Sequence, residues 1–537
     1  MRAEWLRLLA PGALAFLLYL PSLGGSFLYD DAGNIVENRA LGAGLGAVLR
    51  HEPARPLLGL TWAINHAVSG LDPWSYHLLN GLIHGVSTGL VAWLLLWISP
   101  RAAGPASQGR AVFGACLFAV TPMAVETVAY VSSRSTALCS LFVLASLRLG
   151  VVALESGGRR PLAGSLLLYA LALLTKEEAA ALPLLLILLD VFFVRQGPSR
   201  RRLVILGAYF MLPVLGLAAR RLATGAWLPP LSLDRGIYLV TQAAAFPGYL
   251  VRAAFPFDPA LFRGIAPAPW PPDAWTLAFA GLGVWLVLGA LALRRRAPAA
   301  AFAVLWLAAC LVPSSSFVPL REMVVDHRAY LGGVGVVYAL SRVPWGPDRP
   351  LFAAGLLALL AARNVQYQRV LADPIRAWED AVSRATGSAE AWRGLGEAYA
   401  AAGDARAEAA LQRAVLLGRA DARSWANLGV YYLSKQRREE AERALRRAAS
   451  AAPRDARIRD NLAMLLEAEG RGEEALLEYE AAVRGWPAIA QPRIRLALLL
   501  IERGDHDRGR QLLDEAARLE IDAEDARAIE AARSRLR

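Results

Sequence analysis

Residues 8–31, LLAPGALAFLLYLPSLGGSFLYDD, decide how the chain is organised. Their apolar part, 8–24, is long enough to cross most of the hydrocarbon core of a bilayer. Two arginines precede it, and Asp30 and Asp31 follow it. Because basic flanks stay on the cytoplasmic side, we expect a retained first membrane helix, not a cleaved signal peptide. The acidic pair then lies at the outer membrane face.

The composition is that of a polytopic membrane protein. The chain has 537 residues, of which 56% are hydrophobic, and a formal net charge of +12 that comes almost entirely from arginine. Many of the arginines lie in short clusters between apolar runs and no nucleic-acid motif accompanies them, so nucleic acid is not expected as a partner. The three cysteines all lie in apolar segments, which argues against a disulfide framework.

The apolar runs predict about eleven membrane spans. Their approximate positions are 8–24, 78–98, 111–125, 135–154, 162–175, 179–194, 203–222, 274–293, 298–312, 329–342 and 350–365. With this count the arginine clusters between spans fall on the same side as the amino terminus. A further apolar stretch, 236–256, would place the triple arginine 294–296 outside if it crossed, so we expect it to be interfacial or re-entrant.

From residue 366 the apolar runs stop and a repeat begins. The set Trp392, Leu395, Gly396 and Tyr399 recurs as Trp425, Leu428, Gly429 and Tyr432. This is the tetratricopeptide pattern, with a period of about 34 residues. The predicted domains are therefore 1–365, in the membrane, and 366–537, with about four repeats, a leading half repeat (374–386) and a capping helix (523–537). The first spacing is one residue short, which predicts a tightened turn near Gly403.

Four of the outer connections gather ionisable residues at one membrane face, where unpaired charge is costly unless it serves a site. The candidates are Asp30 and Asp31 in the first connection, Glu126 and Arg134 in the second, Lys176 and Glu177 in the third, and Arg328 in the last. Transfer from a lipid-linked phosphate needs a cation to hold the phosphate and a carboxylate base. Either aspartate fits the base, with a slight preference for Asp31, and Arg134, Lys176 or Arg328 fits the phosphate clamp.

Two alternatives to this interpretation stay open. The charges could close off helix ends and pair with one another, or the two aspartates could bind a divalent cation through their oxygens. His84 lies within a predicted span, with His77 and Asn80 at helical spacing. It fits a substrate-binding residue or a buried histidine hydrogen-bonded to a neighbour.

Taken in order, several segments resemble the transmembrane and tetratricopeptide repeat-containing O-mannosyltransferases and their bacterial relatives. These segments are FLYDDAGNIVEN, RPLLGLTWAINHAVSGLDPWSYHLLNGLIH, TPMAVETVAYVSSRS, LLTKEEAAALPLLLILLD and DHRAYLGGVG, followed by the repeats. The resemblance implies an all-α, GT-C type membrane domain and a polyprenyl-phosphate-linked sugar donor such as dolichyl-phosphate mannose.

The resemblance also implies roles for single residues. Asp30 and Asp31 match the family's acidic pair, and Glu126 with Arg134 falls in the stretch that resembles its second outer loop. Lys176 with Glu177 matches the KE step, and Arg328 lies in a segment that resembles the family's ERRLYLP-like stretch. Here glycine replaces the proline, and Asp-His stands where an acidic-Arg pair is usual.

The function expected from the resemblance is inverting transfer of mannose or another hexose to Ser or Thr hydroxyls of a protein. The repeats would recruit the acceptor, and membrane lipids would surround the first domain. One alternative is glycosylation of a lipid or envelope glycan, and another is a non-enzymatic membrane scaffold. The arginine-rich, lysine-poor composition suggests a bacterial inner membrane with periplasmic repeats, or an endoplasmic-reticulum setting if the protein is eukaryotic.

Overall fold

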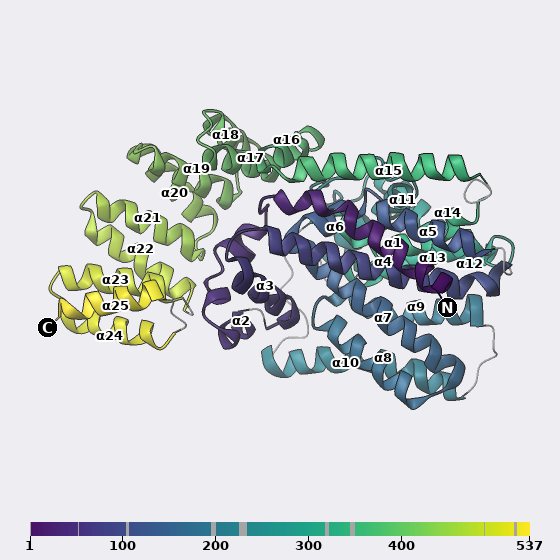
Figure 1. Ribbon diagram of the computed structural model, residues 1–537. Helices are drawn as coiled ribbons and strands as arrows, with labels where there is room; N and C mark the ends of the chain where they lie inside the picture. The colour runs from purple at the N-terminus through teal and green to yellow at the C-terminus, as the bar shows by residue number, and fades with distance from the viewer. Residues whose placement is uncertain are drawn as a thin grey trace. The chain divides into compact units, whose positions relative to one another are not determined.

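The computed structural model describes residues 2–51, 53–103, 107–194, 200–224, 233–316, 322–343, 349–487, 489–519 and 523–536. Within these ranges every regular element is a helix and no strand is present, which confirms the all-α fold class (Figure 1). By its internal contacts the chain divides into two compact units. The membrane unit comprises Met1–Leu41 and Val48–Ala377, and the repeat unit comprises Gly42–Ala47 and Trp378–Arg537.

The membrane unit is a bundle of helices. Its helices are α1 (Arg2–Leu18), α3 (Pro56–Ser69), α4 (Trp74–Ala103), α5 (Gln108–Val120), α6 (Ala124–Ala129), α7 (Arg134–Ser156), α8 (Arg159–Leu173), α9 (Leu182–Leu189), α10 (Arg200–Thr224), α11 (Arg235–Ala254), α12 (Ala274–Leu293), α13 (Pro298–Ser316), α14 (Gly333–Ser341) and α15 (Pro350–Leu371). Among the described residues six helical segments are long and apolar enough to cross a membrane. The number of eleven spans stays a prediction.

Glycines let the first membrane helix lie directly against α4. A Cβ added at Gly12 of α1 would stand 2.7 Å from the carbonyl oxygen of Gly85 in α4. Small residues permit such backbone contact between membrane helices, where packing and not water exclusion drives association. The two glycines therefore fix the crossing point of α1 and α4.

Three of the predicted spans are shorter in the structure than the apolar runs suggest. For 111–125 the helix α5 has 13 residues, because Thr121 precedes Pro122 and leaves the helical conformation. For 179–194 only α9, of 8 residues, is α-helical, between a 3-10 turn and a π turn. For 329–342 the helix α14 has 9 residues and follows the 3-10 turn Asp326–Ala329. The connections that carry the candidate site thus extend into these apolar runs.

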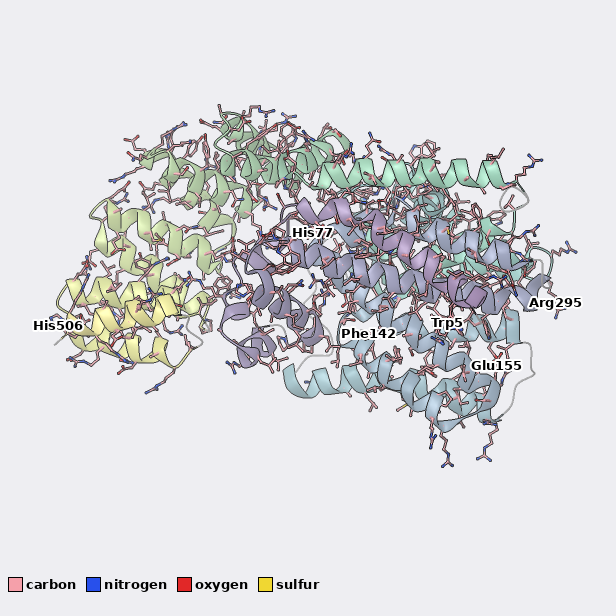
Figure 2. All side chains as sticks on the ribbon, in the orientation of Figure 1. Trp5, His77, Phe142, Glu155, Arg295 and His506 are labelled. Carbon is pink, nitrogen blue, oxygen red and sulfur yellow. The ribbon has the colours of Figure 1, made fainter. Side chains whose placement is uncertain are left out.

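The ends of the membrane unit separate as the charge pattern predicts. In Figure 2 the side chains of Trp5, Glu155 and Arg295 lie toward the end of the bundle opposite to His77. Glu155 closes α7 just before the arginine pair 159–160, and Arg295 belongs to the triple arginine after α12. The amino terminus and two of the arginine clusters therefore lie away from the start of α4.

Helix α11 occupies the apolar stretch 236–256 that was expected to be interfacial or re-entrant. In its first turn the Tyr238 hydroxyl donates to the carbonyl of Ser314, at the end of α13. In its last turn Arg252 forms an ion pair with Asp326, whose carboxylate lies 3.4 Å away. The two ends of α11 thus contact the end of α13 and the connection that follows it, and whether α11 crosses the membrane stays a prediction.

The repeat unit consists of paired helices with the predicted period. They are α16 (Pro374–Arg384), α17 (Ala389–Ala401), α18 (Ala407–Leu417), α19 (Ala422–Ser434), α20 (Arg438–Ala451), α21 (Ala456–Ala468), α22 (Gly472–Gly485), α23 (Ala490–Glu502), α24 (His506–Ala517) and α25 (Ala523–Ser534). The predicted domain boundary at residue 366 lies inside α15. The backbone hydrogen bonds of this helix continue past the point where the sequence becomes less apolar.

The short first repeat has a different cause from the predicted one. The turn between α17 and α18 is not tightened: its left-handed residue Gly403 (φ +71°) is followed by three further residues before α18 begins. The equivalent residues Gln436 (φ 59°) and Gly470 (φ 75°) are followed by one. Helix α18 has 11 residues, whereas α20 and α22 each have 14. The repeat is therefore one residue short because its second helix is shorter, not because its turn is.

An arginine just before the second helix of three successive pairs links one repeat to the next. Arg437 stacks 4.4 Å from the ring centre of Tyr432 and its Nη1 lies 2.7 Å from Glu408 of the preceding repeat. Arg406 repeats both contacts with Tyr399 and Glu379, and Arg471 repeats the ion pair with Glu442. The sequence period therefore carries an ion-pair ladder as well as the apolar core.

Enlarging Gly429 should destabilise the repeat unit. A Cβ at Gly429 would stand 2.8 Å from Cγ of Leu445, whereas nothing lies within 4 Å of one at Gly387. We expect Gly429→Val to lower the free energy of unfolding by about 1–3 kcal/mol, because it overpacks the α19–α20 contact. Thermal unfolding of the full chain in detergent, followed by circular dichroism, measures this. Gly387→Val is the control, and equal effects of the two changes would contradict the expectation.

Candidate functional site

One polar cavity of about 260 Å³ collects most of the candidate residues. It lies in the membrane unit and is formed by six segments that are separate in sequence. The lining residues are Tyr29, Asp30 and Asn34; Arg55, Leu58 and Trp62; Glu126, Tyr130, Ser132, Ser133 and Ser135; Lys176 and Glu177; and Leu261, Glu322, His327 and Arg328. The cavity therefore brings together Asp30, Glu126, Lys176, Glu177 and Arg328 from the sequence prediction.

The two adjacent aspartates have different surroundings. Asp30 is exposed and lines the cavity. Asp31 is fully buried, and its carboxylate accepts hydrogen bonds from the backbone N–H of Leu28 (3.0 Å) and from the N–H (2.7 Å) and hydroxyl of Ser132. Burial raises the pKa of Asp31 to about 7, although the hydrogen bonds from Ser132 and Leu28 act in the opposite direction. Asp31 thus ties the first outer connection to the start of α7.

The backbone just before the pair is in an unusual conformation. Tyr29 has φ 47°, in the left-handed region that costs roughly 1–2 kcal/mol for a residue with a side chain. The ring of Tyr29 lies against that of Tyr130, with centroids 6.4 Å apart, and the Tyr130 hydroxyl accepts from the N–H of Asp30. These contacts with Tyr130 and those of Asp31 hold the strained turn so that Asp30 lies in the cavity wall.

Glu126 is paired with a histidine that the sequence analysis did not single out. Its Oε2 accepts from the backbone N–H of His327 at 2.9 Å, and its Oε1 lies 2.7 Å from Nδ1 of the same residue. The two residues come from α6 and from the 3-10 turn Asp326–Ala329. Glu126 and His327 therefore form one unit in the cavity wall.

The three basic residues of the cavity differ in their partners. Nζ of Lys176 lies 3.0 Å from Glu178, and Arg55 lies 3.1 Å from Glu177. Arg328 instead donates to two backbone carbonyls, those of Glu322 (2.7 Å) and Met323 (3.0 Å), and no described carboxylate forms an ion pair with it. Burial acts to lower the pKa of Arg328, but nearby Tyr249, Tyr238 and the carboxylates of Glu178 and Glu322 outweigh it and raise the pKa, so Arg328 stays charged. Arg328 is the basic residue of the cavity that forms no ion pair with a described carboxylate.

Arg134 does not reach the cavity. It is fully buried, and its guanidinium donates to Asn80 (2.6 Å), Asn65 (2.7 Å), Thr61 (3.1 Å) and the carbonyl of Tyr76 (2.9 Å). These partners belong to α3 and α4, whereas Arg134 begins α7. The role in phosphate binding expected from the sequence stays a prediction, whereas in the structure the hydrogen bonds of Arg134 join three helices.

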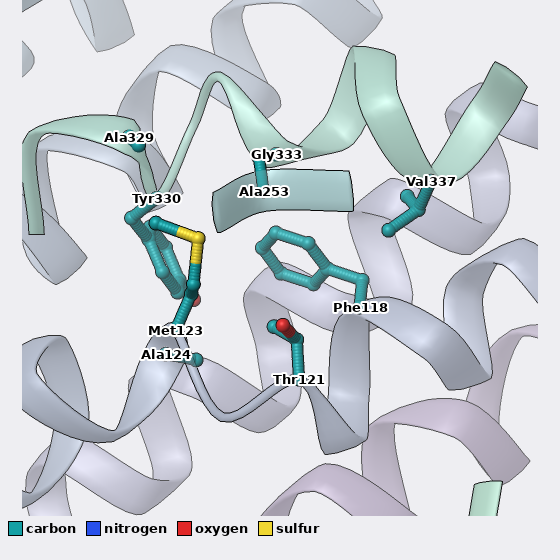
Figure 3. Close-up of a pocket in the computed structure, with 9 residues that line it drawn as sticks. All are labelled: Phe118, Thr121, Met123, Ala124, Ala253, Ala329, Tyr330, Gly333 and Val337. Atoms are coloured by element: carbon teal, nitrogen blue, oxygen red, sulfur yellow. The ribbon is translucent and has the colours of Figure 1, made fainter. Parts of the chain in front are cut away.

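His84 also lies outside the cavity. Its Nε2 faces the carbonyl of Ala119 (3.2 Å), which can only accept, so Nε2 carries the proton and Nδ1 accepts from the Tyr330 hydroxyl (2.7 Å). Tyr330 also lines a small apolar cavity of about 20 Å³, where Figure 3 shows it beside Met123 and Phe118. That volume holds about one water molecule. His84 is therefore a buried histidine with both ring nitrogens satisfied.

Sequence reasoning missed the residues that only long-range contacts bring to the site. Arg55 meets Glu177 across 122 positions, and His327 meets Glu126 across 201. Asp326, whose role the resemblance left in doubt, is buried and accepts from Arg263 (2.6 Å) and from the N–H of Ala260 (3.1 Å). A signal for Arg55 and His327 existed in their positions on outer connections, but no local spacing links them to their partners.

The described residues contain no group of three or more His, Cys, Asp or Glu side chains arranged to hold a metal ion. Within the predicted acidic pair, both oxygens of Asp31 already accept hydrogen bonds from N–H groups. Each oxygen of Asp31 therefore already has a hydrogen-bond donor as its partner.

The fold and the cavity define a helical membrane protein with a polar site at one end of its bundle and a tetratricopeptide array. The tetratricopeptide repeat family profile matches residues 422–455. The chain is 32% identical over 227 residues to protein O-mannosyl-transferase Tmtc2 of Drosophila melanogaster, covering 37% of this chain and 24% of that protein. It is 36% identical over 158 residues to human TMTC2, covering 26% and 18%.

A third relative, mouse protein O-mannosyl-transferase TMTC3, is 29% identical over 237 residues, which are 40% of this chain and 23% of that protein. The resemblance stated from the sequence segments is thus confirmed. The chain spans about a quarter or less of the length of the curated relatives it matches.

Solved structures match part of the chain. The crystal structure of MamA is 22% identical, covering 26% of this chain and 78% of that one, with a TM-score of 0.24. The structure of YrrB, titled a TPR protein with an unusual peptide-binding site, is 21% identical, covering 33% and 89%, with a TM-score of 0.26. At these TM-scores the likeness says nothing further about this chain.

Arg134→Lys should destabilise the membrane unit. Lysine has no planar fork, so it leaves buried acceptors among Asn65, Asn80 and the Tyr76 carbonyl without their donors. Each such loss costs about 1–3 kcal/mol, and we expect a lower thermal midpoint and a reduced folded yield in detergent. Arg294→Lys, at an exposed position, is the control. An unchanged midpoint for Arg134→Lys would show that the hydrogen-bond network is not needed for stability.

Proposed function

We propose that the protein is an integral-membrane glycosyltransferase that moves a sugar from a polyprenyl-phosphate donor to a Ser or Thr hydroxyl of a protein. The transferred sugar is mannose or another hexose, and the reaction takes place at the outer membrane face. One observation carries the proposal: a single cavity holds an exposed carboxylate, Asp30, and a buried arginine without a carboxylate partner among the described residues, Arg328. Similarity to protein O-mannosyl-transferases supports the same chemistry.

In the proposed reaction Asp30 takes the proton of the acceptor hydroxyl while that oxygen attacks the anomeric carbon of the sugar. The bond between this carbon and the phosphate oxygen breaks, and its electron pair leaves with the lipid phosphate. Attack from the side opposite to the phosphate inverts the configuration. Asp30 suits the base better than Asp31, because the Asp31 oxygens already accept three hydrogen bonds from Leu28 and Ser132.

The phosphate gains negative charge as the bond breaks, and a fixed cation beside it lowers the energy of that state. Arg328 fits this role because its position is fixed by the carbonyls of Glu322 and Met323 while it forms no ion pair with a described carboxylate. Lys176 and Arg55 line the same cavity but are paired with Glu178 and Glu177, so they contribute a weaker field.

We further propose that the GT-C type domain ends near residue 365 and that the repeats, from 366, present the acceptor polypeptide. A bacterial inner membrane with periplasmic repeats fits the arginine clusters at the amino-terminal side. The tetratricopeptide match at 422–455 supports a role in holding an extended peptide or a partner protein.

Single substitutions of the aspartates test the proposed base. We expect Asp30→Asn to lower sugar transfer by about 10²- to 10⁴-fold with an unchanged thermal midpoint, since it removes a general base from an exposed position. Asp31→Asn should lower the thermal midpoint, because an amide nitrogen would face a backbone N–H. The assay uses the purified full chain, a labelled polyprenyl-phosphate mannose and a mixed peptide pool. Full activity of Asp30→Asn would rule out Asp30 as the base, and label in lipid instead of peptide would identify a glycolipid synthase.

Substitution of Arg328 tests the phosphate clamp. Loss of a charged hydrogen-bond donor to phosphate weakens binding by about 10- to 100-fold, so Arg328→Gln should raise the KM for the donor by that factor. Arg294→Gln removes the same charge from an exposed site outside the cavity and serves as the matched control. Equal KM values for the two variants would refute the assignment.

A further inference from the structure

The Glu126–His327 pair has a geometry that goes beyond an ordinary ion pair. Both carboxylate oxygens of Glu126 face one residue, Oε2 through its backbone N–H and Oε1 through Nδ1. Glu126 is 2% exposed, so it is held from two sides in a nearly dry environment. The ring of His327 therefore has one orientation relative to the cavity.

The other ring nitrogen of His327 is open to the cavity. No described residue makes a hydrogen bond with Nε2. Nε2 is also absent from the buried polar atoms that lack a hydrogen-bond partner among the described residues. His327 lines the cavity, and its side chain is 14% exposed. With Nδ1 turned to Glu126, Nε2 is the polar atom that His327 offers to a bound molecule.

The protonation of the pair decides what Nε2 can bind. When the pair is uncharged overall, one proton is shared between Oε1 and Nδ1, and a second proton resides on Nε2, which is then a donor. Burial, helped by the charge of Asp326, raises the pKa of Glu126 well above its usual value. Burial and then Lys176 lower the pKa of His327 well below its usual value. Both shifts favour the uncharged pair, with N–H at Nε2.

Charged groups surround the pair from several elements. They are Lys176 and Glu178 before α9, Asp326 and Arg328 beside His327, and Arg263 in the connection between α11 and α12. Of these, Lys176 and Arg328 line the same cavity as Nε2. The cavity therefore presents an uncharged N–H donor in the company of two cations, a set that matches phosphoryl oxygens.

We propose that His327, positioned by Glu126, donates a hydrogen bond from Nε2 to a phosphoryl oxygen of the lipid-linked donor. The inference rests on the proposed function and names a contact of the same site. The donor phosphate carries about one negative charge before the sugar leaves and a second one afterwards, so this hydrogen bond strengthens as the bond breaks. Glu126 acts through His327: it fixes the ring and keeps the proton on Nε2.

Two substitutions of His327 distinguish the roles of its two ring nitrogens, Nδ1 and Nε2. The amide nitrogen of glutamine reaches about as far as Nε2, whereas that of asparagine reaches about as far as Nδ1. The probe is polyprenyl monophosphate without sugar, bound to the full chain in nanodiscs, with polyprenol as the phosphate-free comparison. We expect His327→Asn to weaken phosphate-dependent binding by about 10-fold and His327→Gln to retain most of it.

Glu126→Gln supplies a second, independent test. A glutamine amide can donate to Nδ1 while its oxygen accepts from the His327 N–H, so Nε2 keeps its proton. In the unchanged protein binding should weaken as the pH rises through the raised pKa of Glu126, because the pair loses a proton and Nε2 becomes an acceptor. Glu126→Gln should lose this alkaline decline. A structural role alone would not move the pH profile.

The outcomes are distinct. Unchanged binding in His327→Asn, or an unaltered pH profile in Glu126→Gln, overturns the contact while Arg328→Gln still reports on the clamp. Failure of the unchanged protein to prefer polyprenyl monophosphate over polyprenol overturns the proposed donor class together with the contact. Thermal midpoints are measured for each variant, and Glu126→Gln decides the matter if His327→Asn does not fold.

Discussion

Arg134 is a fully buried cation whose guanidinium must be satisfied entirely by protein atoms, and the end of the membrane unit that holds the cavity depends on this constraint. Its acceptors come from α3 and α4, so burial of one charge fixes the positions of three helices. Ser132 and Ser133, which precede it, line the cavity. The network of Arg134 thus determines where the backbone that holds Asp31 must lie.

That backbone in turn separates the two aspartates. Ser132 and Leu28 enclose Asp31, and the strained turn at Tyr29 leaves Asp30 in the cavity wall. Neighbouring residues of identical chemistry thereby acquire different surroundings, one suited to holding the loop and the other to accepting a proton. The difference arises from contacts across about 100 positions of sequence, since Ser132 lies on the second outer connection.

The basic residues of the cavity likewise differ in their partners. Lys176 and Arg55 each have a carboxylate partner, whereas Arg328 is held by neutral carbonyl oxygens. The carboxylate of an ion pair cancels much of the electric field of its cation. A cation held by neutral carbonyl oxygens exerts a stronger attraction on an incoming anion. The pairing state of each side chain, and not its charge alone, therefore ranks the candidates for phosphate binding.

The sequence by itself determined the all-α class, the membrane character and the repeat array, because these follow from local hydropathy and period. It also named five residues of the cavity: Asp30, Glu126, Lys176, Glu177 and Arg328. It did not separate Asp30 from Asp31, exclude Arg134 and His84 from the cavity, or find Arg55 and His327. Only the tertiary structure decided these points, because hydrogen bonds and ion pairs between distant segments leave no periodic trace in a single chain.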